Sequence, residues 1–488
     1  METLFKNPQN NFKGIDEFYT FNEFFTHKLD NGKILLTTRH RAWVTLTEDE
    51  YRLVRENNVH EDPALYKTLI NLNIILTKGN VRKAAKQYGN KYEFTKRPPG
   101  LHILVPTHRC NLVCTYCHAR SHPNACKKET DMDEDLAKMT IDFMMSIPRG
   151  YKHQNVEIQG GEALLRWDTC QYIIEYTKKK SEALGWKKPS FIVGTNLTLM
   201  DEDILGEIDR DFKDGYHWNI SSSLDGPRHV HNVHRKYPNG KGSYDDVIYW
   251  IKILKRDYPH LFSSCIPTVT KAGIGHEKEI INEYLKHKLT NIKLRHVNYT
   301  GRTYDQVKAG RHDLFVNAKE YFDFWKKSVE YVISVNQKGT YFVESTSQIF
   351  LNHILTVTAD YMCIRKPCGA AISQLEFNYD GTIQACDGAR SVEQLKLGNV
   401  KTHNYNDVIT SDKSQIFRQF CSESLPMCDN CSWGAYCGYC IGRGINQHGT
   451  PYPKMPKDFE CQLFGMQIPY LFNKLMNPRD RKVLMTWV

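Results

Sequence analysis

The chain has 488 residues, of which 41% are apolar, so it is long enough to build two or three separate hydrophobic cores. No stretch is apolar enough to span a bilayer, and residues 1–18 lack the apolar centre of a secretory signal peptide, so we expect a cytoplasmic protein. The formal net charge of +10 is moderate for this length, and we interpret basic runs such as Lys178-Lys179-Lys180 as solvated helix faces. The basic residues do not cluster with aromatic residues, which disfavours nucleic acid as a partner.

Residues 1–98 carry no metal-ligand pattern. Asn31-Gly32 predicts a tight hairpin turn, because these residues accept positive φ angles, and a third strand is expected at 43–46. Thr47 and Glu50 then form a capping-box pattern that opens a helix, with more helix near 65–72. The region is therefore expected to be a module of three short strands followed by helices.

Residues 99–330 alternate short apolar segments with amphipathic ones, which predicts six βα units and an α/β fold. Right-handed crossovers would curl the parallel sheet into an open partial barrel, with the chemistry at the carboxyl ends of the strands. The expected strands lie near 101–106, 155–159, 190–195, 218–223, 265–270 and 291–297, with helices such as 132–147 and 167–184 between them.

Three cysteines, Cys110, Cys114 and Cys117, follow the first of these strands with the spacing C-x3-C-x2-C. Three thiolates on one tight loop can hold three corners of a cubane iron–sulfur cluster and leave the fourth iron open to a small ligand. Zinc is the alternative, and it needs a fourth ligand. That ligand could be supplied by His108, His118 or His122.

Other polar or glycine-rich segments end the next strands. Gly160-Gly161 permits close backbone approach to a ligand, and the Glu162 carboxylate beside it can accept from an ammonium group. Asn196 ends the third strand, and Ser223 ends the fourth, twelve positions before Arg235. Alone, each is a weak signal.

Residues 331–488 hold a second set of eight cysteines. The dense block from Cys428 to Cys440 could be a zinc ribbon, but eight thiols also suit two complete four-cysteine cages. Cys421 is a spare candidate, whereas Cys126, Cys170 and Cys265 have no such context and are expected to be small core residues. The eight are Cys363, Cys368, Cys386, Cys428, Cys431, Cys437, Cys440 and Cys461.

These motifs, in this order, resemble the radical S-adenosylmethionine (SAM) superfamily. The segment 159–162 is similar to its GGEP motif, with Ala163 in place of proline, which implies that Gly160, Gly161 and Glu162 bind the SAM amino group. The segment 195–197 resembles the TNG-type turn. In the related sulfatase maturases a serine and an arginine separated like Ser223 and Arg235 bind the SAM ribose and carboxylate, and the residue at Tyr116 contacts adenine through its backbone.

The C-terminal cysteines resemble the SPASM extension of radical SAM peptide modifiers. The resemblance implies one auxiliary [4Fe-4S] cluster on Cys363, Cys368, Cys386 and Cys440, and a second on the other four cysteines of the set. The last pair is spaced by two residues, Cys437-x2-Cys440, where relatives usually have three. Asp387 matches an aspartate that acts as a general base on the substrate in sulfatase maturases. A solvated turn aspartate is the alternative.

The N-terminal module is similar to winged-helix leader-peptide recognition domains, in which a precursor peptide adds a strand to the sheet edge. A packing extension is the alternative. Within the superfamily, segments such as LRHVNYTGR and FNYDGTIQACDGAR resemble the B-type maturase of the His-Xaa-Ser peptide system.

The resemblance implies that a reduced cluster cleaves SAM and that the 5′-deoxyadenosyl radical removes a hydrogen from a side chain of a ribosomally made peptide. The implied partners are a precursor peptide, a reductant such as flavodoxin or ferredoxin, and a second radical SAM enzyme. Two alternatives stay open: oxidation of a Cys or Ser in a protein substrate, as in the sulfatase maturases, and a zinc-bound scaffold or RNA-binding protein without turnover. The expected domains are 1–98, 99–330 and 331–488.

Overall fold

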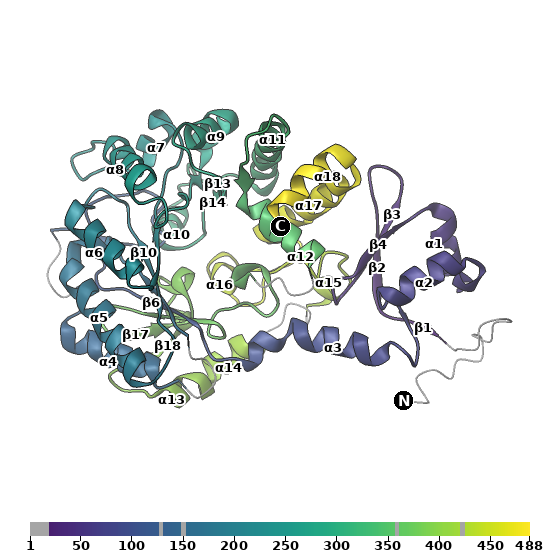
Figure 1. Cartoon of the computed structure of the whole chain (residues 1–488), viewed down its shortest axis with the longest axis horizontal. Helices are drawn as coiled ribbons and strands as arrows, with labels where there is room; N and C mark the ends of the chain where they lie inside the picture. Colours follow the sequence, from purple (N-terminus) through teal and green to yellow (C-terminus); the bar gives the residue numbers. More distant parts are fainter. Residues whose placement is uncertain (1–18, 126–129, 148–152, 357–360, 420–424) are drawn as a thin grey trace.

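The computed structural model describes residues 19–125, 130–147, 153–356, 361–419 and 425–488 (Figure 1). The N-terminal module is the predicted small sheet with helices beside it. The expected turn has Gly32 at φ +82°, and Thr47 and Glu50 form the expected capping box. Its elements are β1 (Thr20–Phe21), β2 (Phe24–Lys28), β3 (Ile34–Thr38), β4 (Trp43–Leu46), α1 (Glu48–Arg55), α2 (Pro63–Asn71), β5 (Ile75–Leu76) and α3 (Val81–Lys91).

The sheet β2-β3-β4 lies between two hydrophobic cores. Leu36 of β3 faces the small core of the module, whereas its neighbour Leu35 belongs to the large core of the rest of the chain. This follows from the alternation of side chains along a strand. The module is therefore packed against the remainder of the protein (Figure 1).

A seven-stranded sheet forms the centre of the protein, in the order β11-β10-β9-β6-β16-β17-β18. Strands β11 to β16 run parallel, and β17 and β18 add antiparallel strands. Helices α4, α5 and α6 cover its outer side (Figure 1). The bounds are β6 (Leu101–Leu104), α4 (Glu134–Met145), β9 (Asn155–Ile158), α5 (Trp167–Ala183), β10 (Ser190–Gly194), α6 (Glu202–Lys213), β11 (His217–Ser221), β16 (Gln374–Phe377), β17 (Thr382–Gln384) and β18 (Lys396–Asn399).

The barrel continues beyond β11 as shorter parallel pairs. A single bridge between Ser222 and Cys265 leads to β12, which pairs with β14, and β13 pairs with β15. The predicted α/β partial barrel is confirmed. The elements are α7 (Arg228–His234), α8 (Tyr244–Asp257), β12 (Thr268–Val269), α9 (Glu277–Lys286), β13 (Asn291–Ile292), β14 (Arg295–His296), α10 (Gly301–Lys308), α11 (Ala318–Gln337), β15 (Val343–Glu344) and α12 (Ser345–Leu355).

The expected domain boundary between residues 330 and 331 stays a prediction, and the structure is continuous on both sides of it. Helix α11 runs through residue 330, and β15 still belongs to the barrel through its pairing with β13. The strand β16 pairs in parallel with β6, with Gln374 opposite Leu101. The C-terminal region therefore shares one sheet with the barrel.

The C-terminal helices close the structure on the side of the N-terminal module. Helix α17 packs against α11 and α12 (Figure 1), and Phe472 contacts Trp43 of β4 with ring centroids 5.3 Å apart. Among the described residues, no helix combines the length and hydropathy needed to cross a membrane. The helices are α13 (Tyr405–Thr410), α14 (Asp412–Gln419), α15 (Pro426–Asp429), α16 (Ile441–His448), α17 (Phe459–Met476) and α18 (Pro478–Leu484).

Candidate functional site

The loop with Cys110, Cys114 and Cys117 leaves the carboxyl end of β6. Two short strands, β7 (Arg109–Cys110) and β8 (His122–Pro123), pair in parallel and close this loop. Cys110 is buried, and the other two thiols are half-buried. We call residues 110–122 the three-cysteine loop.

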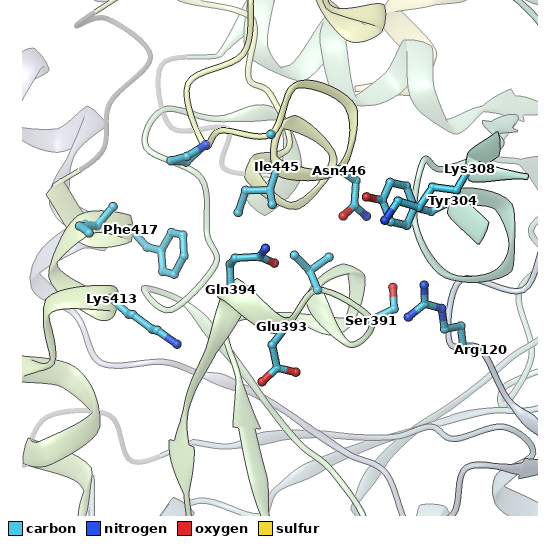
Figure 2. Close-up of a pocket in the computed structure, with 14 residues that line it drawn as sticks. Arg120, Tyr304, Lys308, Ser391, Glu393, Gln394, Lys413, Phe417, Ile445 and Asn446 are labelled. Carbon is cyan, nitrogen blue, oxygen red and sulfur yellow. The ribbon is translucent and has the colours of Figure 1, made fainter. Parts of the chain in front are cut away.

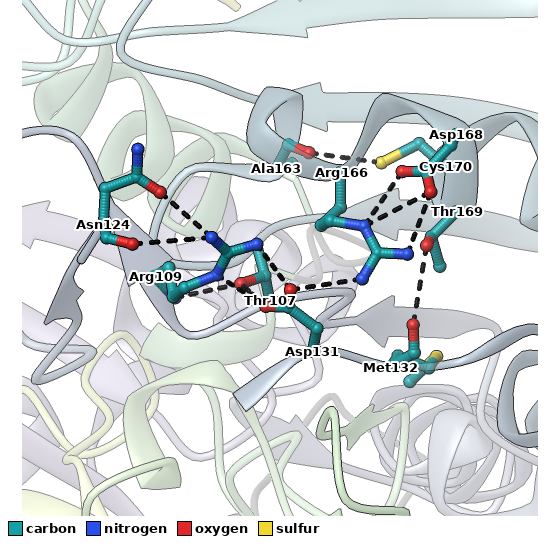
Figure 3. Close-up of polar contacts among 10 residues, drawn as sticks. All are labelled: Thr107, Arg109, Asn124, Asp131, Met132, Ala163, Arg166, Asp168, Thr169 and Cys170. Atoms are coloured by element: carbon teal, nitrogen blue, oxygen red, sulfur yellow. Dashed lines mark hydrogen bonds and ion pairs between the residues drawn. The ribbon is translucent and has the colours of Figure 1, made fainter. Parts of the chain in front are cut away.

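Asp131 anchors the start of the three-cysteine loop (Figure 3). It accepts hydrogen bonds from Thr107, Arg109 and Arg166, with its Oδ1 2.6 Å from the Thr107 hydroxyl. Burial opposes ionisation of Asp131, but these hydrogen bonds outweigh it and lower its pKa. Since Arg109 directly precedes Cys110, this ion-pair network fixes the backbone on which the first thiol sits.

Gly160 and Gly161 pack tightly against the same backbone. A Cβ atom on Gly160 would lie 2.6 Å from the Thr107 carbonyl oxygen, and one on Gly161 would lie 2.2 Å from that of Arg109. Both distances are shorter than real Cβ contacts, so only glycine fits. The two glycines therefore allow close approach of the backbone of Thr107 and Arg109, in addition to the expected approach of a ligand.

Glu162 is buried, and its carboxylate is used within the protein. It accepts hydrogen bonds from the Thr195 hydroxyl at 2.7 Å, the Asn196 backbone N–H at 2.7 Å and the Leu164 N–H at 3.2 Å. Burial raises its pKa, and these hydrogen bonds work against that rise. The structure thus gives Glu162 a positioning role between two strand ends, and its contact with the SAM amino group stays a prediction.

Asn196 lies beside the three-cysteine loop. Its Nδ2 donates to the Asn111 Oδ1 at 2.8 Å and lies 3.9 Å from the Cys110 sulfur. Leu197, where the TNG-type turn has glycine, keeps a positive φ of +66° although its side chain is fully buried. The turn therefore keeps its glycine-like backbone and places Asn196 next to the first thiol.

Tyr116 and Arg235 meet at a shared buried carboxylate. The Tyr116 hydroxyl donates to Asp225, and the Arg235 Nε lies 3.1 Å from the same Asp225 oxygen. The Arg235 guanidinium also lies over the Tyr116 ring, 5.3 Å from its centroid. Burial opposes the charge on Arg235, but Asp225 holds its pKa well above the usual range. Ser223 is half-buried at the end of β11, two residues before Asp225.

Helix α10 holds the three-cysteine loop from the other side, which the sequence analysis did not recognise. The Arg302 guanidinium donates to the carbonyls of Cys114 (3.0 Å) and Ser121, and its backbone N–H donates to that of Cys117 (2.9 Å). Gly301 has φ +62°, and a Cβ there would lie 2.4 Å from the Cys117 carbonyl oxygen. In the sequence, residues 300–302 belong to the segment LRHVNYTGR, and its resemblance to a known maturase was the only signal for this contact.

Four of the C-terminal cysteines gather beside Asp387. Burial raises the pKa of the Cys386 thiol, and Asp387, Cys440, Cys368 and Cys363 raise it further in that order. Such mutual effects require short distances between the groups. The structure therefore brings together the four cysteines expected for one cage.

The other four form a separate group. Burial raises the pKa of Cys437; Lys366 partly offsets this, and Cys431, Cys461 and Cys428 add to it. Cys428 and Cys431 likewise raise the pKa of Cys461, to about 11 together with burial, which is the main cause. The grouping matches the expected second cage, whereas the spare candidate Cys421 lies outside the described residues.

The cysteine groups do not have the spacing of a closed zinc site. Tetrahedral zinc with Zn–S bonds of about 2.3 Å places its sulfur ligands about 3.8 Å apart. Within the described ranges, no set of three potential ligand atoms that includes a cysteine sulfur has all its atoms within 4.8 Å of one another. A four-iron cubane separates its thiolate ligands more widely, so the donor sets fit clusters better than single zinc ions.

Asp387 lies near basic side chains from the barrel and from its own segment. Burial opposes its ionisation, but His118, Arg295 and Arg390 outweigh burial and lower its pKa. Arg390 forms a buried ion pair with Glu376 at 2.7 Å and donates to the Gly160 carbonyl at 3.2 Å. Asp387 thus lies near His118 of the three-cysteine loop and near Arg390, which contacts the glycine motif.

Polar atoms without protein partners also lie in this region. In the described part of the chain, the buried His118 Nε2, Ser222 Oγ and Thr300 Oγ1 have no hydrogen-bond partner. These atoms are therefore free to bond to water or to a ligand. By contrast, Cys170 and Cys265 are fully buried core residues as expected, and Cys126 lies outside the described residues.

A cavity of about 520 Å³ opens between α10 and the C-terminal region (Figure 2). Tyr304 and Lys308 of α10 line one side, and Phe417 and Ile445 line the other. Arg120, three residues after Cys117, also lines it. The cavity therefore adjoins the three-cysteine loop, and no sequence motif indicated it.

Comparisons with known proteins agree with this organisation. A model described as the radical SAM superfamily matches residues 104–277, and one described as an iron–sulfur cluster-binding domain (SPASM) matches 368–432. A cysteine-type anaerobic sulfatase-maturating enzyme of Clostridium perfringens is 22% identical over 393 residues, which cover 78% of this chain and 98% of that protein. An uncharacterised protein of Methanocaldococcus jannaschii is 32% identical over 154 residues, 31% of this chain, and the match spans about half (48%) of that relative's length.

Two solved structures have a similar fold. Native anSMEcpe with bound AdoMet has a TM-score of 0.64 at 20% identity and covers 78% of this chain and 99% of that one. Streptococcus suis SuiB bound to precursor peptide SuiA has a TM-score of 0.53 at 14% identity, and covers 91% of this chain and 100% of that one. The family models thus identify a radical SAM domain at residues 104–277, which includes the three-cysteine loop and part of the partial barrel, and a SPASM domain at residues 368–432 in the cysteine-rich C-terminal region.

Proposed function

We propose that the eleven grouped cysteines hold three clusters. A radical SAM enzyme uses a [4Fe-4S] cluster and SAM, and a SPASM domain binds auxiliary iron–sulfur clusters. Cys110, Cys114 and Cys117 are assigned to the SAM-binding cluster, because only this group offers three thiols rather than four. The two C-terminal groups are assigned to the auxiliary clusters.

Anaerobically reconstituted protein is expected to contain about twelve iron atoms per chain, since each of three cubanes holds about four. The measurement is iron and zinc analysis of the reconstituted full-length chain. Iron near four per chain, with zinc in the C-terminal cysteine groups, would contradict the two auxiliary clusters.

We propose further that the enzyme modifies a side chain of a ribosomally synthesised peptide. The bound cluster and SAM supply a 5′-deoxyadenosyl radical that removes a hydrogen atom from the substrate. The chain itself positions these groups: Asn196 lies against Cys110, Arg235 is held by Asp225, and Asp387 lies beside His118. The cavity between α10 and α16 would admit the peptide next to the three-cysteine loop.

The observation that carries the peptide proposal is the N-terminal sheet, which packs on the segment between Cys431 and Cys437. The Thr37 hydroxyl donates to the Ser432 carbonyl at 2.9 Å, and the Arg41 guanidinium donates to that of Ala435 at 3.1 Å. SuiB, solved with its precursor peptide, matches a larger share of this chain than anSMEcpe does. A recognition module in contact with the SPASM domain could deliver a bound precursor to the active site.

The outer edge of β4 is suited to bind an added strand. The Thr38 N–H donates to the Ala42 carbonyl, so Thr38 and Ala42 are a hydrogen-bonded pair. Because such pairs alternate along an antiparallel ladder, the backbone N–H and C=O of Val44 point toward β3, and those of Trp43 and Thr45 point away from it. Among the described residues, no strand pairs with this edge. The opposite edge, on β2, is partly covered, because the Thr26 carbonyl accepts from the Ser432 hydroxyl.

Replacing Thr45 by Pro in the full-length enzyme is expected to weaken binding of the precursor leader about fivefold. The change removes one outward N–H, and one lost hydrogen bond corresponds to about 1 kcal/mol. Fluorescence anisotropy with a labelled precursor encoded beside the gene would measure the affinity. Point substitution is preferable to deletion of residues 1–98, which would remove Thr37 and Arg41 and leave the Ser432 and Ala435 carbonyls without these donors.

The matched control is Thr26→Pro, which removes an outward N–H from the opposite edge of the same sheet. It should bind the leader as the wild type does, and both variants should still cleave SAM without peptide. Unchanged affinity in Thr45→Pro would show that the leader does not add to β4.

A second candidate function is oxidation of a Cys or Ser in a protein substrate. Asp387 favours it, because the residue lies beside Cys386 as in the resemblance to sulfatase maturases. The two functions are distinguished by incubating the enzyme with a sulfatase-derived Cys or Ser peptide and with its own precursor. A mass loss in the sulfatase peptide alone would favour the second function.

The proposal retains the expected partners. These are a reductant such as flavodoxin or ferredoxin and a second radical SAM enzyme, as the resemblance to the B-type His-Xaa-Ser maturase implies. A cytoplasmic location belongs to the same proposal, since clusters need reduced cysteines.

A further inference from the structure

Two histidines and a glutamate converge on the surface, away from every cysteine group. His229 is the second residue of α7, His276 directly precedes α9, and Glu279 lies in the first turn of α9. The His229 Nε2 lies 3.5 Å from the His276 Nδ1 and 3.4 Å from a Glu279 oxygen, and the His276 Nδ1 lies 2.9 Å from the other Glu279 oxygen. One potential ligand atom from each residue thus lies within 4.8 Å of the other two.

These separations match the ligand spacing of a small divalent metal ion. Zinc bonds of about 2.0–2.1 Å to nitrogen or oxygen in a tetrahedron place neighbouring donors about 3.4 Å apart. The group is the only set of three potential ligands in the described residues whose donor atoms all lie within 4.8 Å of one another. Its side chains are 57%, 37% and 55% exposed, so water can occupy a fourth position.

The charges around the group suit a cation. Glu279 supplies one negative charge, and the hydrogen bond from His276 lowers its pKa. The nearby Arg228 guanidinium is paired with Asp245, so its charge is compensated. Two neutral imidazoles and one carboxylate form a ligand set that zinc prefers over calcium or magnesium, which favour oxygen.

We propose that His229, His276 and Glu279 bind a zinc-like divalent transition-metal ion that links α7 to α9. The site is independent of the iron–sulfur clusters and of the proposed peptide substrate.

The position of this site implies a structural effect on the SAM-binding region. At the C-terminal end of α7, the His234 Nε2 and the Thr270 hydroxyl lie 2.9 Å apart, and Arg235 follows as the next residue. The metal would fix the N-terminal end of the same helix. Both ends of α7 would then be tied to the segment 270–279, which stiffens the support of Arg235.

The test is an anaerobic zinc titration of the cluster-loaded, full-length protein by isothermal calorimetry. The wild type is expected to bind one more zinc equivalent than His229→Ala or His276→Ala, with the same iron content in all three proteins. Because each variant keeps every cysteine, zinc bound by thiols cancels in the comparison. The control is His312→Ala, which removes an exposed histidine outside the group.

Hydrogen exchange provides a second measurement that does not depend on activity. Zinc should slow exchange in α7 of the wild type and of His312→Ala, but not in His276→Ala. Equal zinc stoichiometry in wild type and both site variants, or unchanged exchange in wild-type α7 on adding zinc, would overturn the proposal. The exposed positions of the three side chains make misfolding of the variants a minor concern, and the iron content reports it directly.

Discussion

Replacing Cys110, Cys114 and Cys117 together by Ala is expected to abolish reductive SAM cleavage, with no detectable 5′-deoxyadenosine. This loop alone offers three thiols rather than four, and a cluster held by three thiolates keeps one iron open for SAM. The auxiliary groups lie in a different part of the chain, so they should keep their iron. The content should fall from about twelve to about eight atoms per chain.

The measurement combines chromatography of SAM products with iron analysis of the same anaerobic samples. Cys170→Ala is the matched control, since Cys170 is a fully buried thiol in α5 outside all three cysteine groups. It should keep all iron and full SAM cleavage. If the triple variant still formed 5′-deoxyadenosine, the SAM-binding cluster would have to lie elsewhere.

Local features of the fold could be predicted because their signals are local. The C-x3-C-x2-C spacing, the Asn31-Gly32 turn and the Thr47–Glu50 capping box each involve residues within eight positions of one another. The alternation of strands and helices likewise predicted the partial barrel. In these cases the sequence pattern and the backbone geometry depend on the same few residues.

Pairings between distant segments could not be predicted. Strand β16 lies beside β6 although Gln374 and Leu101 are 273 positions apart, and nothing in a short apolar strand names its partner. The contact of Thr37 with Ser432 likewise joins residues that are 395 positions apart and could not be predicted. As a result, the sequence did not indicate that the barrel and the C-terminal region share one sheet.

Two motif residues also make contacts with distant segments that the sequence alone did not indicate. The expected contact of Glu162 with SAM stays a prediction, and the structure adds that its carboxylate accepts from Thr195 and Asn196 at the end of the neighbouring strand. Likewise, the structure adds to the expected ligand approach of Gly161 a close packing against the Arg109 carbonyl. A sequence motif indicates which residue type a position requires. The structure shows which neighbouring group imposes that requirement.

Helix α10 leads to the second strong prediction, that Arg302→Ala destabilises the SAM-binding cluster. The guanidinium joins two carbonyls of the three-cysteine loop, that of Cys114 inside the loop and that of Ser121 near its end. Loss of a group that orients metal ligands typically costs about 10- to 100-fold in affinity or activity. We therefore expect SAM cleavage to fall by about this factor.

A readout besides activity separates this role from a general loss of stability. On exposure to air, Arg302→Ala should lose about four of its twelve irons faster than the wild type, while the auxiliary clusters persist. Arg302→Lys should not restore the loop, because one ammonium group cannot reproduce the planar fork that reaches both carbonyls. Arg311→Ala, an exposed arginine just after α10, is the matched control and should behave as the wild type. If Arg302→Ala kept wild-type SAM cleavage and cluster lifetime, α10 would be a packing element without influence on the three-cysteine loop.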